Sequence, residues 1–344
     1  MKILFTGKSD FKYNRTAILL QGLEQHPEIE VVKYPITKRR DFDVHEFKRI
    51  QDTVDWIYIP PFRHGDVSFI KKWATKPIVF DPLISKYLTK VVDYGHFWKA
   101  PMKYFLDRIP FKKADLLIAD TQCHKEMFSQ LFGVSLSSIE VLPIGADTEV
   151  YAQAPVINTD GKFHVGFYGT FVPLQGVSKI IECAKILEGE TDIVFDIIGT
   201  GYEHKKILKL IDRYSLSNVN MMGWVKYNEL PQYMSRFNIC LGIFGDSKKA
   251  DAVIPNKMYH YAALGKCVIT KDTTGIKEMF TNGENAILCK NDPVLMAQQI
   301  TELKSAEARV ERIGKNAREL MVQGYTPHNI ADRFIRLLRL HQPK

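Results

Sequence analysis

The sequence lacks several features that would place its 344 residues in a specialised class. No apolar run approaches the roughly 18 residues of a membrane-spanning helix, and the apolar stretch after Met1 is too short for a signal peptide. No two of the five cysteines have C-x-x-C spacing, which argues against a zinc ribbon or a redox motif. We expect the cysteines to be buried free thiols and the protein to be cytoplasmic.

Acidic residues are too few to balance the basic ones. The chain has 47 Lys and Arg against 39 Asp and Glu, a formal net charge of +8. This excess favours anionic partners such as nucleotides, phosphates or an acidic membrane face. Nucleic acid is not expected as a partner, because the sequence has no helix-turn-helix, zinc or RNP-type motif.

The basic residues are concentrated between Ile84 and Lys113, where seven of them stand against two acidic residues, among several aromatic residues. Such a segment is typical of a chain that lies on an anionic leaflet, so 84–113 is predicted to place the protein at the inner face of the membrane as a peripheral protein. The alternative is ordinary solvated helices whose lysine stems cover apolar surface.

Short apolar runs alternate with helical patterns from end to end. Examples are "KILFTG", "DWIYIP" and "ADLLIADT" in the first half, and "FHVGFYG", "DIVFDIIGTG" and "KCVIT" in the second. Strands buried on both faces of a parallel sheet have this appearance, and their alternation with helices indicates βαβ units. The polar segment 145–162, with Pro155 and Asp160-Gly161, interrupts the pattern and is predicted to be an interdomain linker.

The stretch "VIPNKMYHYAALGKCVIT", residues 253–270, predicts a helix that leads into a strand. Pro255 suits the start of a helix and Asn256 can cap it, but Lys257 in the first turn opposes the helix dipole. A bound phosphate would compensate by accepting from the ammonium and from backbone N–H groups. The sequence therefore predicts an anion site here, with a solvated lysine as the alternative.

Two glycine-bearing loops also follow predicted strands of the second half. Gly166, Gly169 and Gly176 belong to the first loop, and Gly199 and Gly201 to the second. Ligands of open parallel sheets bind beyond the carboxyl ends of the strands, where glycine lets the backbone approach them closely. The alternative is that these glycines only turn the chain.

The order and spacing of four stretches resemble the retaining nucleotide-sugar glycosyltransferases of family 4. These stretches are "YGTFVPLQGVSKIIECAKIL", "FDIIGTGYEHKKI", "MGWVKYNELPQYMSRFNICLGIF" and "IPNKMYHYAALGKCVITKDTTGIKEMFTNGENAIL". The resemblance covers 161–325 and is looser in the first half, through "KPIVFDPLISKY", "ADLLIADTQCH" and "IEVLPIGADTEVY". It implies an α/β protein of the GT-B fold, in which two doubly wound Rossmann-like domains face each other across a cleft.

The resemblance also implies a division of labour along the chain. Residues 1–155 would form an acceptor-side domain, 156–325 a nucleotide-sugar donor domain, and 326–344 a helix that crosses back onto the first domain. Its implied donor-binding residues are Gly7, Gly169, Thr170, Gln175, Gly199, Gly201, Val225, Asp246, Asn256, Lys257 and His260.

The sequence departs from the family pattern at the donor site. Thr170 and Gln175 stand where the family usually has an arginine and a lysine that contact the donor diphosphate. A usual pair of glutamates would fall at His260 and near Asp251 or Ala252, so neither is present in register. An inactive relative is therefore one alternative.

If the enzyme is active, the resemblance implies substitute roles. Lys257 would supply the lost positive charge as a catalytic residue, His260 would face the ribose, and Asp246 or Asp251 would face the donor sugar. Asp81, after "KPIVF", would be a catalytic base or sugar-orienting group, with a turn cap before a proline as the alternative.

The implied reaction is sugar transfer with retention, by front-face attack and without a protein nucleophile. Backbone N–H groups of Gly169 and Thr170, Lys257 and the helix N-terminus would stabilise the leaving diphosphate, so neither a metal nor a cofactor is expected. The expected partners are a nucleoside-diphosphate sugar and a glycan or lipid-linked acceptor, in polysaccharide biosynthesis. Two alternatives are a sugar-nucleotide epimerase of the same fold and a non-catalytic nucleotide-binding or membrane-docking scaffold.

Overall fold

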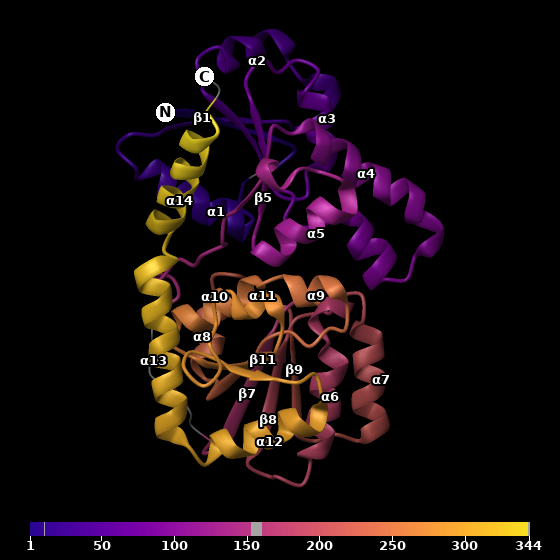
Figure 1. Ribbon diagram of the computed structural model, residues 1–344. Coiled ribbons are helices and arrows are strands. Elements are labelled where there is room, and N and C mark those ends of the chain that lie inside the picture. The colour runs from indigo at the N-terminus through magenta and orange to yellow at the C-terminus, as the bar shows by residue number, and fades with distance from the viewer. Residues whose placement is uncertain (10, 153–159, 343–344) are drawn as a thin grey trace. The chain divides into compact units, whose positions relative to one another are not determined.

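The protein is described by a computed structural model that covers residues 1–9, 11–152 and 160–342. It forms two compact units, residues 1–145 with 325–344 and residues 146–324, each built on a six-stranded sheet (Figure 1). The domain boundary predicted at 155/156 and the middle of the predicted linker lie outside the described residues.

The sheet of the first unit is parallel throughout, with the order β2-β1-β3-β4-β5-β6. Its strands are β1 (Lys2–Gly7), β2 (Glu30–Pro35), β3 (Trp56–Ile59), β4 (Ile78–Phe80), β5 (Leu116–Ala119) and β6 (Ile139–Val141). Strands β3, β4 and β5 are buried along their whole length, which explains their unbroken apolar runs. The strand order reverses between β1 and β3, so the switch point of this sheet lies between their carboxyl ends.

Helices flank this sheet and include one from the end of the chain. They are α1 (Asn14–Glu24), α2 (Val44–Gln51), α3 (His64–Ile70), α4 (Ala100–Lys113), α5 (Gln122–Phe132) and α14 (Pro327–Leu340). Shorter turns are η1 (Arg39–Asp41), η2 (Leu88–Asp93), η3 (Phe97–Lys99) and η4 (Leu136–Ser138).

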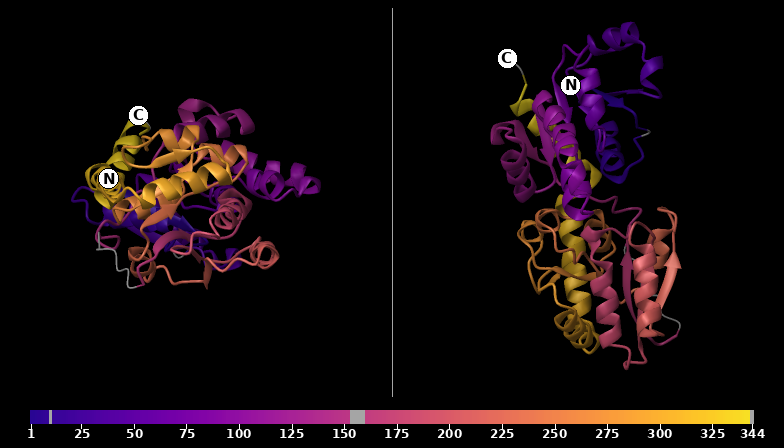
Figure 2. Two further views of the ribbon diagram at one scale, coloured as in Figure 1. Left: turned by 90° about the horizontal axis from the view of Figure 1, so that it is seen from below. Right: turned by 90° about the vertical axis from the view of Figure 1, so that its right-hand side faces the viewer.

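Helix α14 packs against α1 (Figures 1 and 2). Its residues Ile330, Phe334 and Leu338 belong to the core formed with α1 and the first strands. The contact is close at Gly22, where a Cβ atom would lie 2.0 Å from the carbonyl oxygen of Pro327. The C-terminal helix is therefore part of the first unit.

The second unit has a parallel sheet with the order β12-β11-β10-β7-β8-β9. Its strands are β7 (Phe163–Tyr168), β8 (Ile193–Ile198), β9 (Val219–Gly223), β10 (Ile239–Leu241), β11 (Cys267–Lys271) and β12 (Ile287–Cys289). The strand order reverses between β7 and β10, so the switch point lies between them. Gly166 lies inside β7, where its bare backbone leaves room for Phe237, and not in the loop where the sequence interpretation placed it.

The helices that flank the second sheet alternate with its strands and continue past the last one (Figures 1 and 2). They are α6 (Val177–Ile186), α7 (His204–Tyr214), α8 (Leu230–Ser235), α9 (Lys248–Ala252), α10 (Asn256–Ala263), α11 (Thr274–Lys277), α12 (Pro293–Lys304) and α13 (Glu307–Gly324), with the turn η5 (Pro173–Gln175). Four of the five cysteines are buried in this unit, as expected, and Cys123 of the first unit is half-buried. Among the described residues, no helix combines the length and the apolar character needed to cross a bilayer.

Candidate functional site

The loops after β7 and β8 pack against each other at the carboxyl edge of the second sheet. The N–H of Gly169 donates to the carbonyl oxygen of Ile198 at 3.0 Å. A Cβ atom on Gly199 would lie 2.0 Å from the carbonyl oxygen of Gly169, and one on Gly201 would lie 2.7 Å from the nitrogen of Phe171. Gly199 and Gly201 also have φ angles of +133° and +155°, so close packing and backbone conformation both require glycine.

Lys257 reaches this edge from the first turn of α10. Its side chain is 3% exposed, and its Nζ lies 3.4 Å from the ring centroid of Phe167 in a cation–π contact. A Cβ atom on Gly169 would lie 2.9 Å from the same Nζ, so the amine lies directly against the β7 loop. Among the described residues, Nζ has no hydrogen-bond partner. Burial places the pKa of Lys257 well below its ordinary value, and the lysine is not a solvated surface side chain.

His260 lies one turn further along α10 and is surrounded by tyrosines. Its Nδ1 is 2.5 Å from the hydroxyl of Tyr168, and its Nε2 is 3.1 Å from the hydroxyl of Tyr227. The ring stacks on Tyr151 with centroids 4.1 Å apart. Burial lowers the pKa of His260 to about 3, so the imidazole is neutral and donates from one nitrogen while accepting at the other. In this arrangement His260 orients three tyrosines, and its predicted contact with a ribose stays a prediction.

The remaining predicted residues of the second unit border the same edge from other loops. The carbonyl oxygen of Gln175 accepts from the N–H of Phe244 at 3.0 Å, which joins the β7 and β10 loops. Asp246 follows in the β10 loop, where its exposed carboxylate accepts from the amide of Asn291. Val225 is buried in the loop after β9, two residues before the tyrosine that contacts His260.

Thr170 and the residues around the start of α10 complete the set. Thr170 is exposed in the β7 loop, next to Gly169. Asn256 is the first residue of α10 and is half-buried beside Lys257. Asp251 belongs to α9 and pairs with Lys271 at 2.7 Å. The glycines, Lys257 and Asn256 thus gather where the strand order reverses, which is where sheets of this topology hold ligands.

Gly7 and Asp81 belong to the first unit. Gly7 ends β1 with a φ of +127°, at that sheet's switch point, and a Cβ atom there would lie 3.4 Å from Pro60. Asp81 follows β4 and is completely buried. Its Oδ2 accepts from Nε of Arg15 and, at 2.9 Å, from the hydroxyl of Tyr58. Burial raises the pKa of Asp81, against the lowering effect of Arg15. These contacts make Asp81 a core ion-pair partner, and its predicted catalytic role stays a prediction.

Comparison with known proteins adds to this geometry. Residues 178–336 match the family described as Glycosyl transferase-like. An uncharacterized glycosyltransferase of Methanocaldococcus jannaschii is 28% identical over 166 residues, which are 48% of this chain and 45% of that protein. The chain therefore matches less than half the length of that relative.

Solved structures match over nearly the whole chain. HepE of Anabaena, in complex with UDP and glucose, has a TM-score of 0.75 at 16% identity, covering 99% of this chain and 100% of that chain. Sucrose-phosphate synthase of Thermosynechococcus elongatus has a TM-score of 0.78 at 14% identity, covering 99% and 98%. The chain has the GT-B fold.

A D-x-D triplet that the sequence interpretation overlooked lies in the first GT-B unit, at Asp41-Phe42-Asp43. Carboxylates in such a pattern are able to bind a divalent metal. Here Asp43 caps α2 by accepting from the N–H groups of His45 and Glu46 at 2.9 and 3.0 Å. Among the described residues, no group of three or more His, Cys, Asp or Glu is arranged to hold a metal ion.

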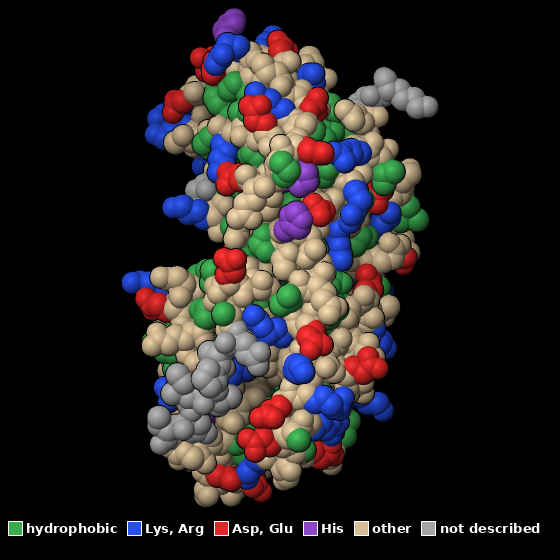
Figure 3. All heavy atoms as spheres, turned by 90° about the vertical axis from the view of Figure 1, so that its left-hand side faces the viewer, with side chains coloured by type: hydrophobic (Ala, Val, Ile, Leu, Met, Phe, Trp, Pro, Cys, Tyr) green, Lys and Arg blue, Asp and Glu red, His purple; other side chains and the backbone are tan. Residues whose placement is uncertain are grey.

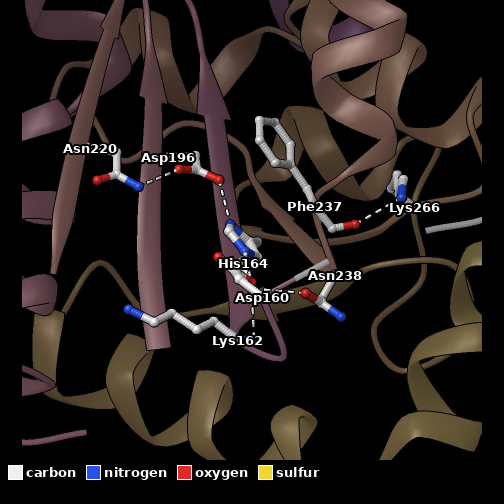
Figure 4. Close-up of polar contacts among 8 residues, drawn as sticks. All are labelled: Asp160, Lys162, His164, Asp196, Asn220, Phe237, Asn238 and Lys266. Atoms are coloured by element: carbon white, nitrogen blue, oxygen red, sulfur yellow. Dashed lines mark hydrogen bonds and ion pairs between the residues drawn. The ribbon is translucent and has the colours of Figure 1, made fainter. Parts of the chain in front are cut away.

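A polar ladder that sequence reasoning missed crosses three strands of the second GT-B unit (Figure 4). His164 Nδ1 on β7 lies 2.6 Å from Asp196 on β8, which accepts from Asn220 on β9 at 3.0 Å. His164 Nε2 lies 3.0 Å from Asp160. The signal that could have revealed this ladder is a polar residue inside each of several apolar runs. Because His164 is the second residue of β7 whereas Gly169 follows its end, the ladder lies at the opposite end of the strand and supports the sheet.

The same view shows a second buried lysine, Lys266, beside the carbonyl oxygen of Phe237 (Figure 4). Its Nζ donates to the carbonyl oxygens of Ser235 and Phe237, each at 2.8 Å. Lys266 follows α10, whereas Lys257 lies in its first turn. The two lysines therefore differ in one respect that matters for binding, since only Lys257 keeps its donors unused.

Proposed function

We propose that this protein is a retaining, metal-independent glycosyltransferase that moves a hexose from a nucleoside-diphosphate sugar to a glycan or a lipid-linked glycan. The Glycosyl transferase-like match and the GT-B fold support the class of enzyme. Because the similar structure of HepE is a complex with UDP and glucose, UDP-sugars are the first donors to test. The proposal includes a place in polysaccharide biosynthesis, in the cytoplasm and peripherally on the inner face of the membrane.

One observation carries the proposal: a buried lysine amine at the switch point of the second unit, without a hydrogen-bond partner among the described residues. Lys257 is 3% exposed and lies against Gly169, which begins a strand-to-helix loop. An unpartnered buried amine is unfavourable, so the protein retains it at a cost in stability. A diphosphate bound here would accept from Nζ and from the N-terminal N–H groups of α10, and would remove that cost.

The proposed chemistry follows from this charge. The bond between the anomeric carbon and a diphosphate oxygen breaks, and its electron pair goes to the diphosphate. The acceptor hydroxyl forms the new bond on the same face of the sugar, and its proton passes to the leaving phosphate oxygen. Lys257 and the backbone N–H of Thr170 would interact most strongly as the negative charge develops, so they would lower the barrier and not only the free energy of the bound donor. The N–H of Gly169, which the sequence interpretation included, already donates to the carbonyl oxygen of Ile198.

A donor panel tests the class of reaction. Purified protein is incubated with UDP-, GDP- and dTDP-sugars, and products are followed by chromatography. Slow hydrolysis or transfer with one donor is expected, with activity kept in EDTA and with product of the donor's anomeric configuration by NMR. Interconversion of sugars without transfer would favour the epimerase of the same fold, and no turnover or binding with any donor would favour a non-catalytic scaffold.

A pair of lysine variants tests the site. Lys257→Met removes the unpartnered amine but keeps most of the side chain's volume. Its expected effect on UDP binding is a loss of about 1.5–3 kcal/mol, the contribution of a charged hydrogen bond, or roughly 10- to 150-fold in Kd by calorimetry. The matched control is Lys266→Met, because that buried amine is already bonded within the protein. Unchanged affinity in Lys257→Met would remove this lysine from the donor site.

A further inference from the structure

Helix α4 carries an apolar stripe on its solvent side. The stripe consists of Met102, Phe105, Leu106 and Ile109, which are 52%, 52%, 42% and 45% exposed. Their spacing of i, i+3, i+4 and i+7 puts them on one face of the helix. Two larger rings continue the apolar surface in the preceding turn η3, where Phe97 is 70% and Trp98 is 74% exposed.

The opposite face of α4 holds the helix against the first unit. Phe111 is buried in the core around β3, β4 and β5, and Tyr104 packs against the same cluster. Asp107 is completely buried and accepts from the hydroxyl of Ser85 at 2.7 Å and from the N–H of Tyr87 at 2.8 Å. The helix is therefore fixed with its apolar stripe directed away from the core that it covers.

Basic side chains flank the stripe on both sides. Lys103 follows Met102 by one residue and Arg108 precedes Ile109 by one, so they project about 100° to either side of the stripe. Lys99, Lys112 and Lys113 extend the positive charge to the two ends of the helix. None of these five side chains forms an ion pair with a described residue.

The face shown in Figure 3 is different, because acidic and basic side chains are interspersed over it. Ion pairs such as Lys315–Glu319 on α13 and Arg339–Glu28 from α14 balance exposed charges elsewhere in the chain. Along α4 the acidic residue is the buried Asp107, which faces inward. The exposed side of α4 is thus apolar along its middle and positive along its edges.

We propose that α4 and η3 dock on an anionic lipid surface, with the helix lying in the plane of the interface. The apolar stripe and the two rings would enter the boundary between headgroups and acyl chains, and the flanking cations would reach anionic headgroups. A stripe alone would suit a protein partner equally well, but unpaired cations on both sides select an anionic surface. This inference rests on the membrane part of the proposed function and makes it specific. Its test measures vesicle binding and not sugar transfer, so a failure of one proposal is distinguishable from a failure of the other.

Trp98 provides a native probe of this docking. The full chain is mixed with phosphatidylcholine vesicles that contain or lack phosphatidylglycerol, and binding is measured by co-sedimentation. Binding at least tenfold tighter with phosphatidylglycerol is expected, and it should weaken as salt is raised. Brominated lipids are expected to quench the tryptophan fluorescence. This quenching should be lost in Trp98→Phe and kept in Trp224→Phe, since Trp224 is equally exposed at 70% but lies in the other unit.

Variants separate the stripe from the cations. Two double variants are made: Phe105→Ser with Ile109→Ser, and Lys103→Glu with Arg108→Glu. Each is expected to reduce vesicle binding at least tenfold. Melting temperatures confirm that both variants are folded. The matched control reverses the charge of two exposed lysines of α7, in the double variant Lys205→Glu with Lys209→Glu. This control is expected to bind vesicles as tightly as the parent protein does.

Three results would overturn the proposal. They are an absence of binding to phosphatidylglycerol vesicles, binding that both α4 double variants leave unchanged, and dimerisation that Phe105→Ser abolishes. The last would mean that a second copy of the chain covers the stripe.

Discussion

The ammonium nitrogen of Lys257 lies 3.4 Å from the centre of the Phe167 ring, which takes the place of a hydrogen-bond partner. A cation–π contact compensates only part of the cost of burying an amine. We therefore expect Lys257→Met to raise the free energy of unfolding by about 1–3 kcal/mol, as measured by urea denaturation. Lys266→Met should lower it, because two carbonyl oxygens lose their donor. If both substitutions changed the free energy of unfolding in the same direction, this explanation would be contradicted.

The buried position of Lys257 also predicts that binding is linked to proton uptake. Burial lowers the pKa of Lys257 in the free protein, and a bound diphosphate would raise it by its negative charge. Between these two pKa values the protein should take up a proton when UDP binds. Calorimetry in two buffers with different ionisation enthalpies should then give different binding enthalpies. In Lys257→Met the enthalpies should agree, and agreement in the parent protein would refute the linkage.

His260 predicts a specific dependence of stability on acid. Burial lowers its pKa to about 3 in the folded protein, against about 6.5 for an unfolded histidine. Between these values the unfolded chain binds the additional proton, so the stability due to neutral His260 is lost as the pH falls from about 6.5 towards 3. Near pH 5 the free energy of unfolding should therefore fall by about 1.4 kcal/mol for each unit by which the pH is lowered. Urea denaturation of His260→Gln should show a slope smaller by that amount, and an unchanged slope in this variant would contradict the linkage.

Asp81 is expected to matter first for folding. Asp81→Asn leaves the guanidinium of Arg15 buried without its charged partner, which costs about 3–5 kcal/mol. The melting temperature should therefore fall sharply, and UDP affinity of the remaining folded protein should be unchanged. A variant with the parent's stability but no transfer activity would instead support the catalytic role suggested by the sequence.

The sequence predicted the strands and helices that carry a periodic or unbroken apolar signal. Trp56–Ile59 and Ile193–Ile198 are strands buried on both faces, and a helix begins at Asn256. The predicted cap is wrong, because Pro255 occupies the N-cap position, Asn256 is the first helical residue and no side chain caps the helix. The strand Ile287–Cys289, whose middle residue is partly exposed, was not predicted, whereas the equally short and completely buried Ile78–Phe80 was. Local pattern was therefore sufficient where burial was continuous.

The candidate site was predictable in position but not in environment. The place of Lys257 in a first turn follows from local sequence, whereas its contact with Phe167 depends on how α10 packs over β7. The hydrogen bond from Tyr168 to His260 joins residues 92 positions apart, and Tyr151 reaches the same ring from before β7. Such contacts depend on strand order and helix packing, which no local pattern contains.

Helix α14 completes the core of the first unit, although the chain reaches it only after the whole of the second unit. During synthesis on the ribosome, residues 1–145 therefore emerge with one side of their core uncovered, while residues 146–324 form a continuous segment that is able to close first. Ile330, Phe334 and Leu338 arrive last and seal the surface of α1. The earlier half of the polypeptide thus finishes folding later, and the apolar surface of α1 stays uncovered until α14 arrives.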